Sequence, residues 1–144
     1  MLHPGGNLGK RLLLKVEMMM VTGAHMPIVH ENVSLSDAII EISSKRLGAT
    51  CVVTEGGILC GILTDGDLRR LLQRTTNITN LTVHQVMTQN PKTIRPNILA
   101  VQALNVMETF KITQLIVVDD HQRPIGVLHL HDLVEAGLGG ESGP

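Results

Sequence analysis

Residues 61–68 read GILTDGDL, and residues 126–133, 65 positions further on, read GVLHLHDL. Both stretches run through a glycine, two apolar residues and a polar residue, and after two more positions reach Asp-Leu. This order indicates a strand that leads directly into a helix. The same offset aligns residues 52–53 with residues 117–118 without a gap. An internal period of this kind predicts two copies of one structural unit.

The arrangement of apolar runs predicts an α+β fold in which a strand, a helix, two strands and a helix occur twice. Each copy is small enough to need the other for a core. The expected parts are a linker from another domain at residues 1–15, the first copy at 16–73, a polar connector at 74–82, the second copy at 83–137 and a disordered tail at 138–144.

Turn and cap residues mark the ends of the elements in the first copy. Ser34 with Asp37 three positions later is a capping-box pattern at a helix start. We expect this helix to end around Leu47 and Gly48, with the glycine in the left-handed cap. The glycine-rich residues 55–57 separate two strand-like runs and suit a hairpin loop.

The bulk composition excludes several classes of partner. The 12 Lys and Arg residues stand against 13 acidic residues, so no global field favours nucleic acid or an anionic membrane. The chain has one Phe and no Tyr or Trp, and therefore lacks a stacking platform for bases. No apolar run approaches the roughly 20 residues that span a bilayer, and we expect a cytoplasmic protein. Cys51 and Cys60 could face each other, but we interpret them as free packing residues.

Thr64 and Asp67 are the main candidate binding residues. They stand at a predicted helix start, where free N–H groups suit a phosphate, and Thr64 adds a hydroxyl. Ionised Asp67 offers two acceptor oxygens, which match the paired hydroxyls of a ribose. Thr-x-x-Asp is also close to a capping box, in which both side chains satisfy backbone donors and bind no ligand. The residues by themselves leave both interpretations open.

The second copy departs from this pattern, because His129 stands at the position of Thr64 while Asp132 is kept. We therefore predict one better site in the first copy and a second that is weaker or differently selective. His129, His131 and Asp132 also suggest metal ligands, but no nearby Cys or Glu completes a tetrahedral set, and we expect no metal.

Arg69 and Arg70 follow the first motif. Such charges usually form a solvated face. If one of them points into a cleft, its planar guanidinium group would suit a phosphate or a sugar-acid carboxylate. This would favour a nucleotide-linked acidic sugar over AMP as the ligand.

The double unit closed by Gly-x-x-Thr-x-x-Asp resembles a tandem pair of cystathionine-β-synthase (CBS) domains, or Bateman module, over about residues 16–136. The resemblance implies two repeats related by a pseudo-twofold axis, packed through their sheets, with nucleotide-type ligands in clefts between them. It also implies that the loop at residues 22–29 borders the nucleotide base. The expected ligand-binding residues are Thr64, Asp67, His129, Asp132, Pro27, Ile28 and Thr50.

A narrower resemblance comes from residues 3–14, HPGGNLGKRLLL, together with residues 62–70 and 127–133. These are similar to the C-terminal part of the D-arabinose 5-phosphate isomerases. In that family an N-terminal sugar isomerase (SIS) domain interconverts ribulose 5-phosphate and arabinose 5-phosphate, for synthesis of Kdo in lipopolysaccharide or capsule. His3 matches the family's active-site histidine. A general acid or base must be held within reach of its substrate, so we expect no turnover by this chain alone, and no cofactor.

The resemblance implies a regulatory sensor that binds a nucleotide or nucleotide sugar, such as AMP or CMP-Kdo, and biases an attached SIS domain. The expected assemblies are a homodimer through the CBS pair and a tetramer when the SIS domain is present. In the alternative, the pair binds nothing and only stabilises oligomers. An independent enzyme is a weak third interpretation, because no nucleophile, base and orienting residue occur together.

Overall fold

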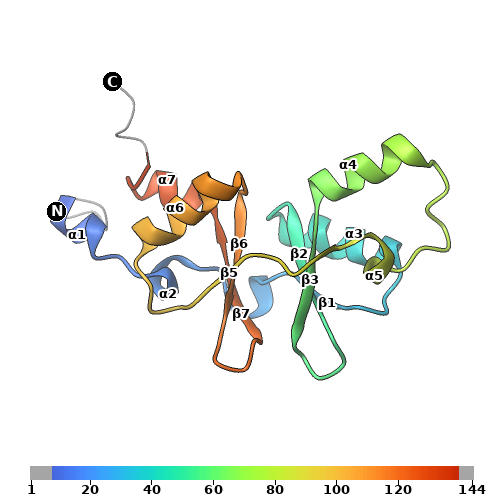
Figure 1. The fold of residues 1–144 in the computed structure, drawn as a ribbon, viewed down its shortest axis with the longest axis horizontal. Helices are drawn as coiled ribbons and strands as arrows, with labels where there is room; N and C mark the ends of the chain where they lie inside the picture. The colour runs from blue at the N-terminus through green and yellow to red at the C-terminus, as the bar shows by residue number, and fades with distance from the viewer. Residues whose placement is uncertain (1–7, 140–144) are drawn as a thin grey trace.

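The computed structural model describes residues 8–139. The chain forms two similar halves, each a small sheet with helices on its outer side, and the two sheets lie next to each other at the centre (Figure 1). The predicted α+β class with two copies of one unit is confirmed. In chain order the elements are α1 (Leu8–Leu12), α2 (Val16–Met19), the 3-10 turn η1 (Gly23–His25), β1 (Ile28–His30), α3 (Leu35–Lys45), β2 (Ala49–Val53), β3 (Leu59–Thr64), α4 (Asp65–Arg74), α5 (Val83–Val86), β4 (Thr88–Gln89), β5 (Thr93–Ile94), α6 (Ala100–Phe110), β6 (Gln114–Val118), β7 (Pro124–His129) and α7 (Leu130–Glu135).

The first three strands of each sheet share one topology, and β4 adds a fourth strand to the first sheet. The first has the strand order β1-β2-β3-β4 and the second has the order β5-β6-β7. In each sheet the first two strands are parallel and the next pair is an antiparallel hairpin. The register of each hairpin shifts at the equivalent place, between Val52 and Val53 and between Val117 and Val118. The repeated sequence therefore produces a repeated fold, down to the position of the bulge.

The halves exchange their first helices. The side chain of Val16, at the start of α2, is fully buried in the core formed with α6, β6 and α7 of the second half, and its N–H donates to Ile98 O at 2.8 Å. Val83, at the start of α5, is fully buried in the core of α3, β2 and β3, and its N–H donates to Val33 O at 3.0 Å. Each half is thus completed by the short helix that precedes the other half in the chain.

A third apolar cluster joins the two sheets. Its buried members are Cys51, Ile116, Val118 and Val127. The Gln114 side-chain amide adds a hydrogen bond across the interface, donating to Leu47 O at 2.9 Å. This third cluster packs the two sheets against each other.

The two cysteines lie on different faces of the first sheet. Cys51 belongs to the cluster between the sheets, whereas Cys60 packs toward α3 and α4. Both thiols are free, so their interpretation as packing residues holds and the suggestion that they could face each other is wrong. Burial raises the pKa of Cys51 to about 12, which keeps that thiol protonated and unreactive.

The cap of α3 differs from the expected one. Ser34 Oγ accepts a hydrogen bond from Asp37 N at 3.0 Å, as the start pattern predicts. The helix ends at Lys45, and the residue in the left-handed cap is Arg46, at φ +63°, rather than Gly48. Gly48 lies in the turn that follows. Its φ is also positive, and a Cβ at this position would lie 3.0 Å from the Gln114 side-chain nitrogen, so glycine suits the position.

Some expectations fall at the ends of the chain. His3 and residues 140–144 lie outside the described part, whereas Leu138 packs against the core of the second half. Between residues 8 and 139, no helix is long and apolar enough to cross a bilayer.

Candidate ligand-binding cleft

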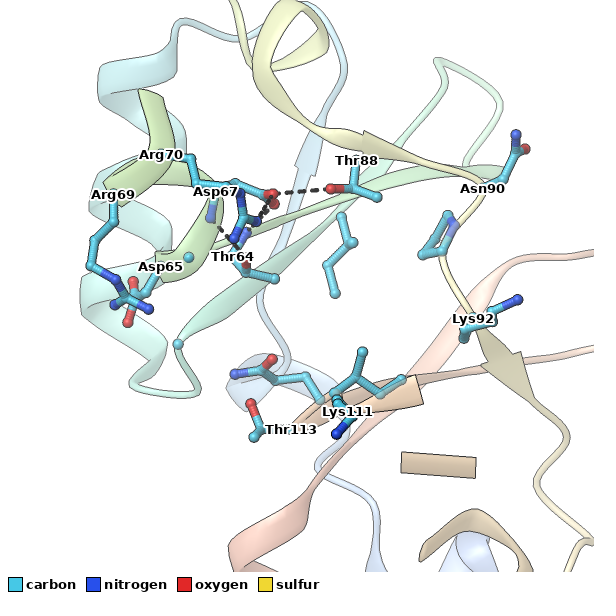
Figure 2. Close-up of a pocket in the computed structure, with 16 residues that line it drawn as sticks. Thr64, Asp65, Asp67, Arg69, Arg70, Thr88, Asn90, Lys92, Lys111 and Thr113 are labelled. Carbon is cyan, nitrogen blue, oxygen red and sulfur yellow. Dashed lines mark hydrogen bonds and ion pairs between the residues drawn. The ribbon is translucent and has the colours of Figure 1, made fainter. Parts of the chain in front are cut away.

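An open cleft of about 600 Å³ lies where the two halves meet. Three segments contribute most of it: the start of α4, residues 88–92 from β4 toward β5, and residues 111–114 from the end of α6 to the first residue of β6 (Figure 2). The first motif therefore faces segments of the second half. The volume is in the range of pockets that hold small organic ligands.

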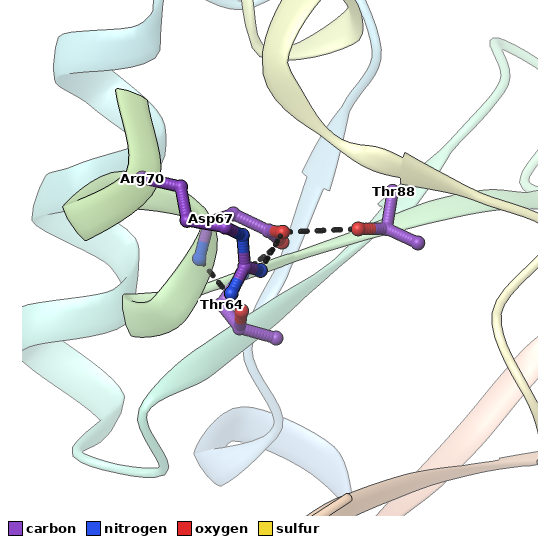
Figure 3. Close-up of polar contacts among 4 residues, drawn as sticks. All are labelled: Thr64, Asp67, Arg70 and Thr88. Atoms are coloured by element: carbon purple, nitrogen blue, oxygen red, sulfur yellow. Dashed lines mark hydrogen bonds and ion pairs between the residues drawn. The ribbon is translucent and has the colours of Figure 1, made fainter. Parts of the chain in front are cut away.

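Thr64 and Asp67 form a complete capping box at the start of α4. Thr64 Oγ1 accepts from Asp67 N at 3.1 Å, and Asp67 Oδ2 accepts from Thr64 N at 2.9 Å. The second carboxylate oxygen, Oδ1, accepts from Arg70 Nη2 at 2.8 Å and from Thr88 Oγ1 at 3.0 Å (Figure 3). The Asp67 side chain is only 9% exposed, yet it lines the cleft. Asp67 thus caps the helix with one oxygen and directs the other toward the cleft, where a ligand would share or replace existing partners.

The charges around the cleft are mostly positive. Its lining includes the cations Arg69, Arg70, Lys92 and Lys111 and the carboxylates Asp65 and Asp67. The N-terminal amide groups of the ten-residue helix α4 add partial positive charge. Such a set of donors favours a ligand with more than one negative group.

The second motif is differently arranged. His129 is the N-cap of α7, and its Nδ1 accepts a hydrogen bond from His131 N at 3.1 Å. In this arrangement Nδ1 is occupied as an acceptor, so only Nε2 of His129 is left to donate to a ligand.

The two motifs also differ in charge. At the positions of Arg69 and Arg70, the second copy has Val134 and Glu135. Asp132 and Glu135 therefore place two carboxylates where the first copy pairs a carboxylate with an arginine. This difference supports the prediction that the two copies do not offer equivalent anion sites.

Of the expected binding residues, the structure brings Thr64 and Asp67 into the cleft, and the other described candidates lie elsewhere. Pro27 and Ile28 precede and begin β1, where Ile28 N donates to Glu41 Oε2 at 3.0 Å. Thr50 is fully buried and its hydroxyl donates to Cys51 O at 3.1 Å, so it has no surface to offer a ligand here.

The cleft also contains residues that sequence reasoning missed, namely Thr88, Asn90, Lys92 and Lys111. The loop at residues 22–29 is expected beside the ligand, but residues 88–92 line the cleft instead, because the chain crosses from one half to the other at this point. The 65-residue period maps Pro27 onto Lys92, so applying the repeat to this loop would have identified the segment.

No group of three or more His, Cys, Asp and Glu side chains within residues 8–139 is placed to hold a metal ion. The groups gathered at the cleft are hydroxyls, carboxylates, cations and helix amides. This set can bind a polar, anionic ligand through hydrogen bonds and charge.

Curated relatives match nearly the whole chain. The chain is 52% identical over 136 residues to arabinose 5-phosphate isomerase KdsD of Pseudomonas aeruginosa, covering 94% of this chain and 42% of the relative. It is 45% identical over 137 residues to the protein of the same name from Escherichia coli K12, covering 94% and 41%. The chain therefore spans about two fifths of the length of these relatives.

Solved structures have the same fold. CBSX2 in complex with AMP gives a TM-score of 0.73 at 24% identity, covering 87% of this chain and 96% of that one. The CBS domain pair of MJ0100, in complex with 5′-methylthioadenosine and S-adenosyl-L-methionine, gives 0.77 at 24% identity, covering 90% and 98%. The sequence model of the CBS domain matches twice, at residues 16–74 and 83–139, in agreement with the two structural halves. This chain is a tandem CBS pair and belongs to the CBS-domain family.

Proposed function

We propose that this chain is the ligand-sensing CBS pair of an arabinose 5-phosphate isomerase, and that it binds a nucleotide or nucleotide sugar in the cleft at the start of α4. The observation that carries the proposal is the placement of Asp67 Oδ1 at a cleft surrounded by cations. The similarity to the KdsD proteins supports the assignment to this enzyme. The AMP complex of a protein with the same fold supports the ligand class.

The chemistry of the cleft matches the parts of such a ligand. Asp67 Oδ1 accepts hydrogen bonds from a ribose diol, while the Thr64 hydroxyl and the Gly66 N–H donate to a phosphate. The neighbouring amides are already bonded, since Asp65 N donates to Gly48 O at 3.0 Å and Asp67 N to Thr64 Oγ1 at 3.1 Å. Arg69, Arg70 and Lys111 are more cations than a single phosphate needs, whereas the Lys92 ammonium lies over the Phe110 ring, 4.2 Å from its centroid. A nucleotide sugar with a carboxylate, such as CMP-Kdo, uses this set more fully than AMP does.

In the whole protein, the ligand biases a catalytic SIS domain that interconverts ribulose 5-phosphate and arabinose 5-phosphate for Kdo, and so for lipopolysaccharide or capsule, in the cytoplasm. Control of this kind requires that the ligand bind two arrangements of the pair with different affinity. The residues described here hold and sense the ligand, and the SIS domain performs the isomerisation.

Calorimetric titration with AMP, ATP and CMP-Kdo tests the proposal, using Asp67→Asn and the matched variant Asp132→Asn. Asp67→Asn replaces one acceptor oxygen by an amide and should weaken binding about tenfold or more, since a hydrogen bond to a charged group is worth about 1.5–3 kcal/mol. Asp132→Asn, in the second motif, should change affinity less than twofold. Circular dichroism confirms that both variants are folded. If the wild-type chain binds none of the three ligands, the proposal is wrong.

The alternative, a ligand-free oligomerisation module, is favoured by apolar side chains exposed on the outer helices. Ile40 on α3 is 64% exposed, Leu72 on α4 54% and Phe110 on α6 49%. These faces would be covered in a homodimer of the pair, and in a tetramer of the full-length protein. Sedimentation with and without the three ligands separates the two functions, because a stable dimer that responds to no ligand supports assembly alone.

A further inference from the structure

Arg70 occupies the place where the proposed ligand would bind. Its Nη2 donates to Asp67 Oδ1 at 2.8 Å, the oxygen that faces the cleft (Figure 3). A Cβ built on Gly66 would lie 3.4 Å from Arg70 Nη1, so the guanidinium also lies across the first turn of α4. One side chain therefore bonds the carboxylate proposed for the diol and lies against Gly66 in the first turn of α4, beside the place proposed for the phosphate.

The two partners of this ion pair differ in their freedom to move. The Arg70 side chain is 67% exposed, whereas that of Asp67 is 9% exposed and is held by Thr64 N and Thr88 Oγ1. An ion pair with one exposed member is weak, because water screens it and the long side chain loses entropy when it is fixed. A ligand can therefore displace Arg70 while Asp67 stays in place.

We propose that Arg70 is a specificity-determining residue that selects ligands carrying an anionic group as well as a vicinal diol. The inference rests on the proposed function of the cleft. A neutral nucleoside must take Asp67 Oδ1 from Arg70 and offers the displaced guanidinium no partner. A nucleotide takes the same oxygen but gives the guanidinium a phosphate, with charge-assisted hydrogen bonds in place of the lost one.

The neighbouring arginine provides a matched control. Arg69 lines the same cleft and carries the same charge, but Figure 2 shows its side chain beside Asp65 rather than on the Asp67 carboxylate. Arg69→Ala therefore removes one positive charge from the cleft and leaves the contact between Arg70 and Asp67 intact.

Calorimetric titration of the wild type, Arg70→Ala and Arg69→Ala with adenosine, AMP, cytidine and CMP tests the inference. Arg70→Ala should weaken binding of the monophosphates about tenfold, because a hydrogen-bonded charge is lost. It should strengthen binding of the matching nucleosides about two- to five-fold, because the competitor for Asp67 is gone. Arg69→Ala should weaken the monophosphates and leave the nucleosides within about twofold.

The diagnostic result is that Arg70→Ala weakens monophosphate binding and strengthens nucleoside binding. If Arg70→Ala weakens nucleoside and monophosphate equally, or if Arg69→Ala also strengthens nucleoside binding, the role of Arg70 is overturned while the proposed function stands. If the wild-type chain binds no monophosphate, both the proposed function and this inference are wrong. Arg70→Met retains the aliphatic stem of the side chain and repeats the test if the alanine variant loses its circular dichroism signal.

Discussion

Asp67 gains its fixed position from the helix that it caps. The bond from Thr64 N to Oδ2 holds the carboxylate in one orientation, and this leaves Oδ1 at the cleft. A ligand that binds Oδ1 does not have to order the side chain, so little rotamer entropy is lost on binding. The capping role and the proposed binding role thus support each other.

Two glycines allow a methionine to lie directly on each hairpin. A Cβ at Gly61 would lie 2.3 Å from Met87 Sδ, and one at Gly126 would lie 2.5 Å from Met20 Sδ. Gly61→Ala should therefore lower the free energy of unfolding by about 1–3 kcal/mol, as overpacking does, because the Met87 side chain has to move.

Urea unfolding of Gly61→Ala, Met87→Ala and the double variant measures this contact. Met87→Ala removes the opposing atoms, so the double variant should be more stable than the sum of the single effects indicates. Strictly additive losses would contradict the proposed clash. Gly126→Ala with Met20→Ala repeats the cycle in the second half.

The sequence predicts the pair Thr64 and Asp67 because a helix start is a local feature. It does not decide between a cap and a ligand site, since that depends on what faces Asp67 Oδ1. Thr88 reaches this oxygen from 21 positions along the chain, and Lys111 reaches the cleft from the end of another helix. Contacts of this range depend on how the halves are paired, which no local pattern specifies.

At the scale of elements, Glu41 on α3 connects this helix to the start of β1 through a hydrogen bond. Its Oε2 accepts from Ile28 N at 3.0 Å and from Lys45 Nζ at 2.7 Å. Burial acts to raise the pKa of Glu41, but the hydrogen bonds from Lys45 and Ile28 outweigh it and hold the pKa below the ordinary 4.5. The ionised carboxylate therefore stabilises the junction between this strand and this helix.

Glu41→Gln should lower the free energy of unfolding by about 1 kcal/mol at neutral pH. Because the pKa of Glu41 is lower in the folded state, its stabilisation is present above the unfolded pKa and is lost as pH falls through the folded one. The difference between wild type and variant should thus shrink below pH 4.5. Urea unfolding at neutral pH and at about pH 3 measures it. A difference that is equal at both pH values would assign the effect to packing.

The ends of two helices show that a local sequence pattern does not always identify the cap residue. Helices α3 and α6 both end in a left-handed residue, Arg46 at φ +63° and Lys111 at φ +56°. The pattern favours Gly48 for this role, because glycine adopts positive φ at least cost. The chain instead uses Gly48 where Gln114 of the other half approaches closely, a requirement set by the packing of the sheets.

At the scale of the whole molecule, the period of 65 residues predicts two copies and their topology. It cannot show that α2 packs on the second half and α5 on the first, because the sequence places each short helix at the start of its own copy. The exchange follows from the backbone contacts of Val16 with Ile98 and of Val83 with Val33. It also links the halves, since each lacks part of its core without a segment of the other.

Val16→Ala and Val83→Ala test this exchange with the same chemical change. Both side chains are fully buried, so each substitution should cost roughly 1–3 kcal/mol through lost burial and a small cavity. Hydrogen exchange measured by mass spectrometry should locate the loss. Val16→Ala should speed exchange first in α6, β6 and β7, far away in sequence, and Val83→Ala should do so first in α3, β2 and β3. If Val16→Ala instead loosens β2 and β3, each short helix stabilises its own copy and the exchange of helices is wrong.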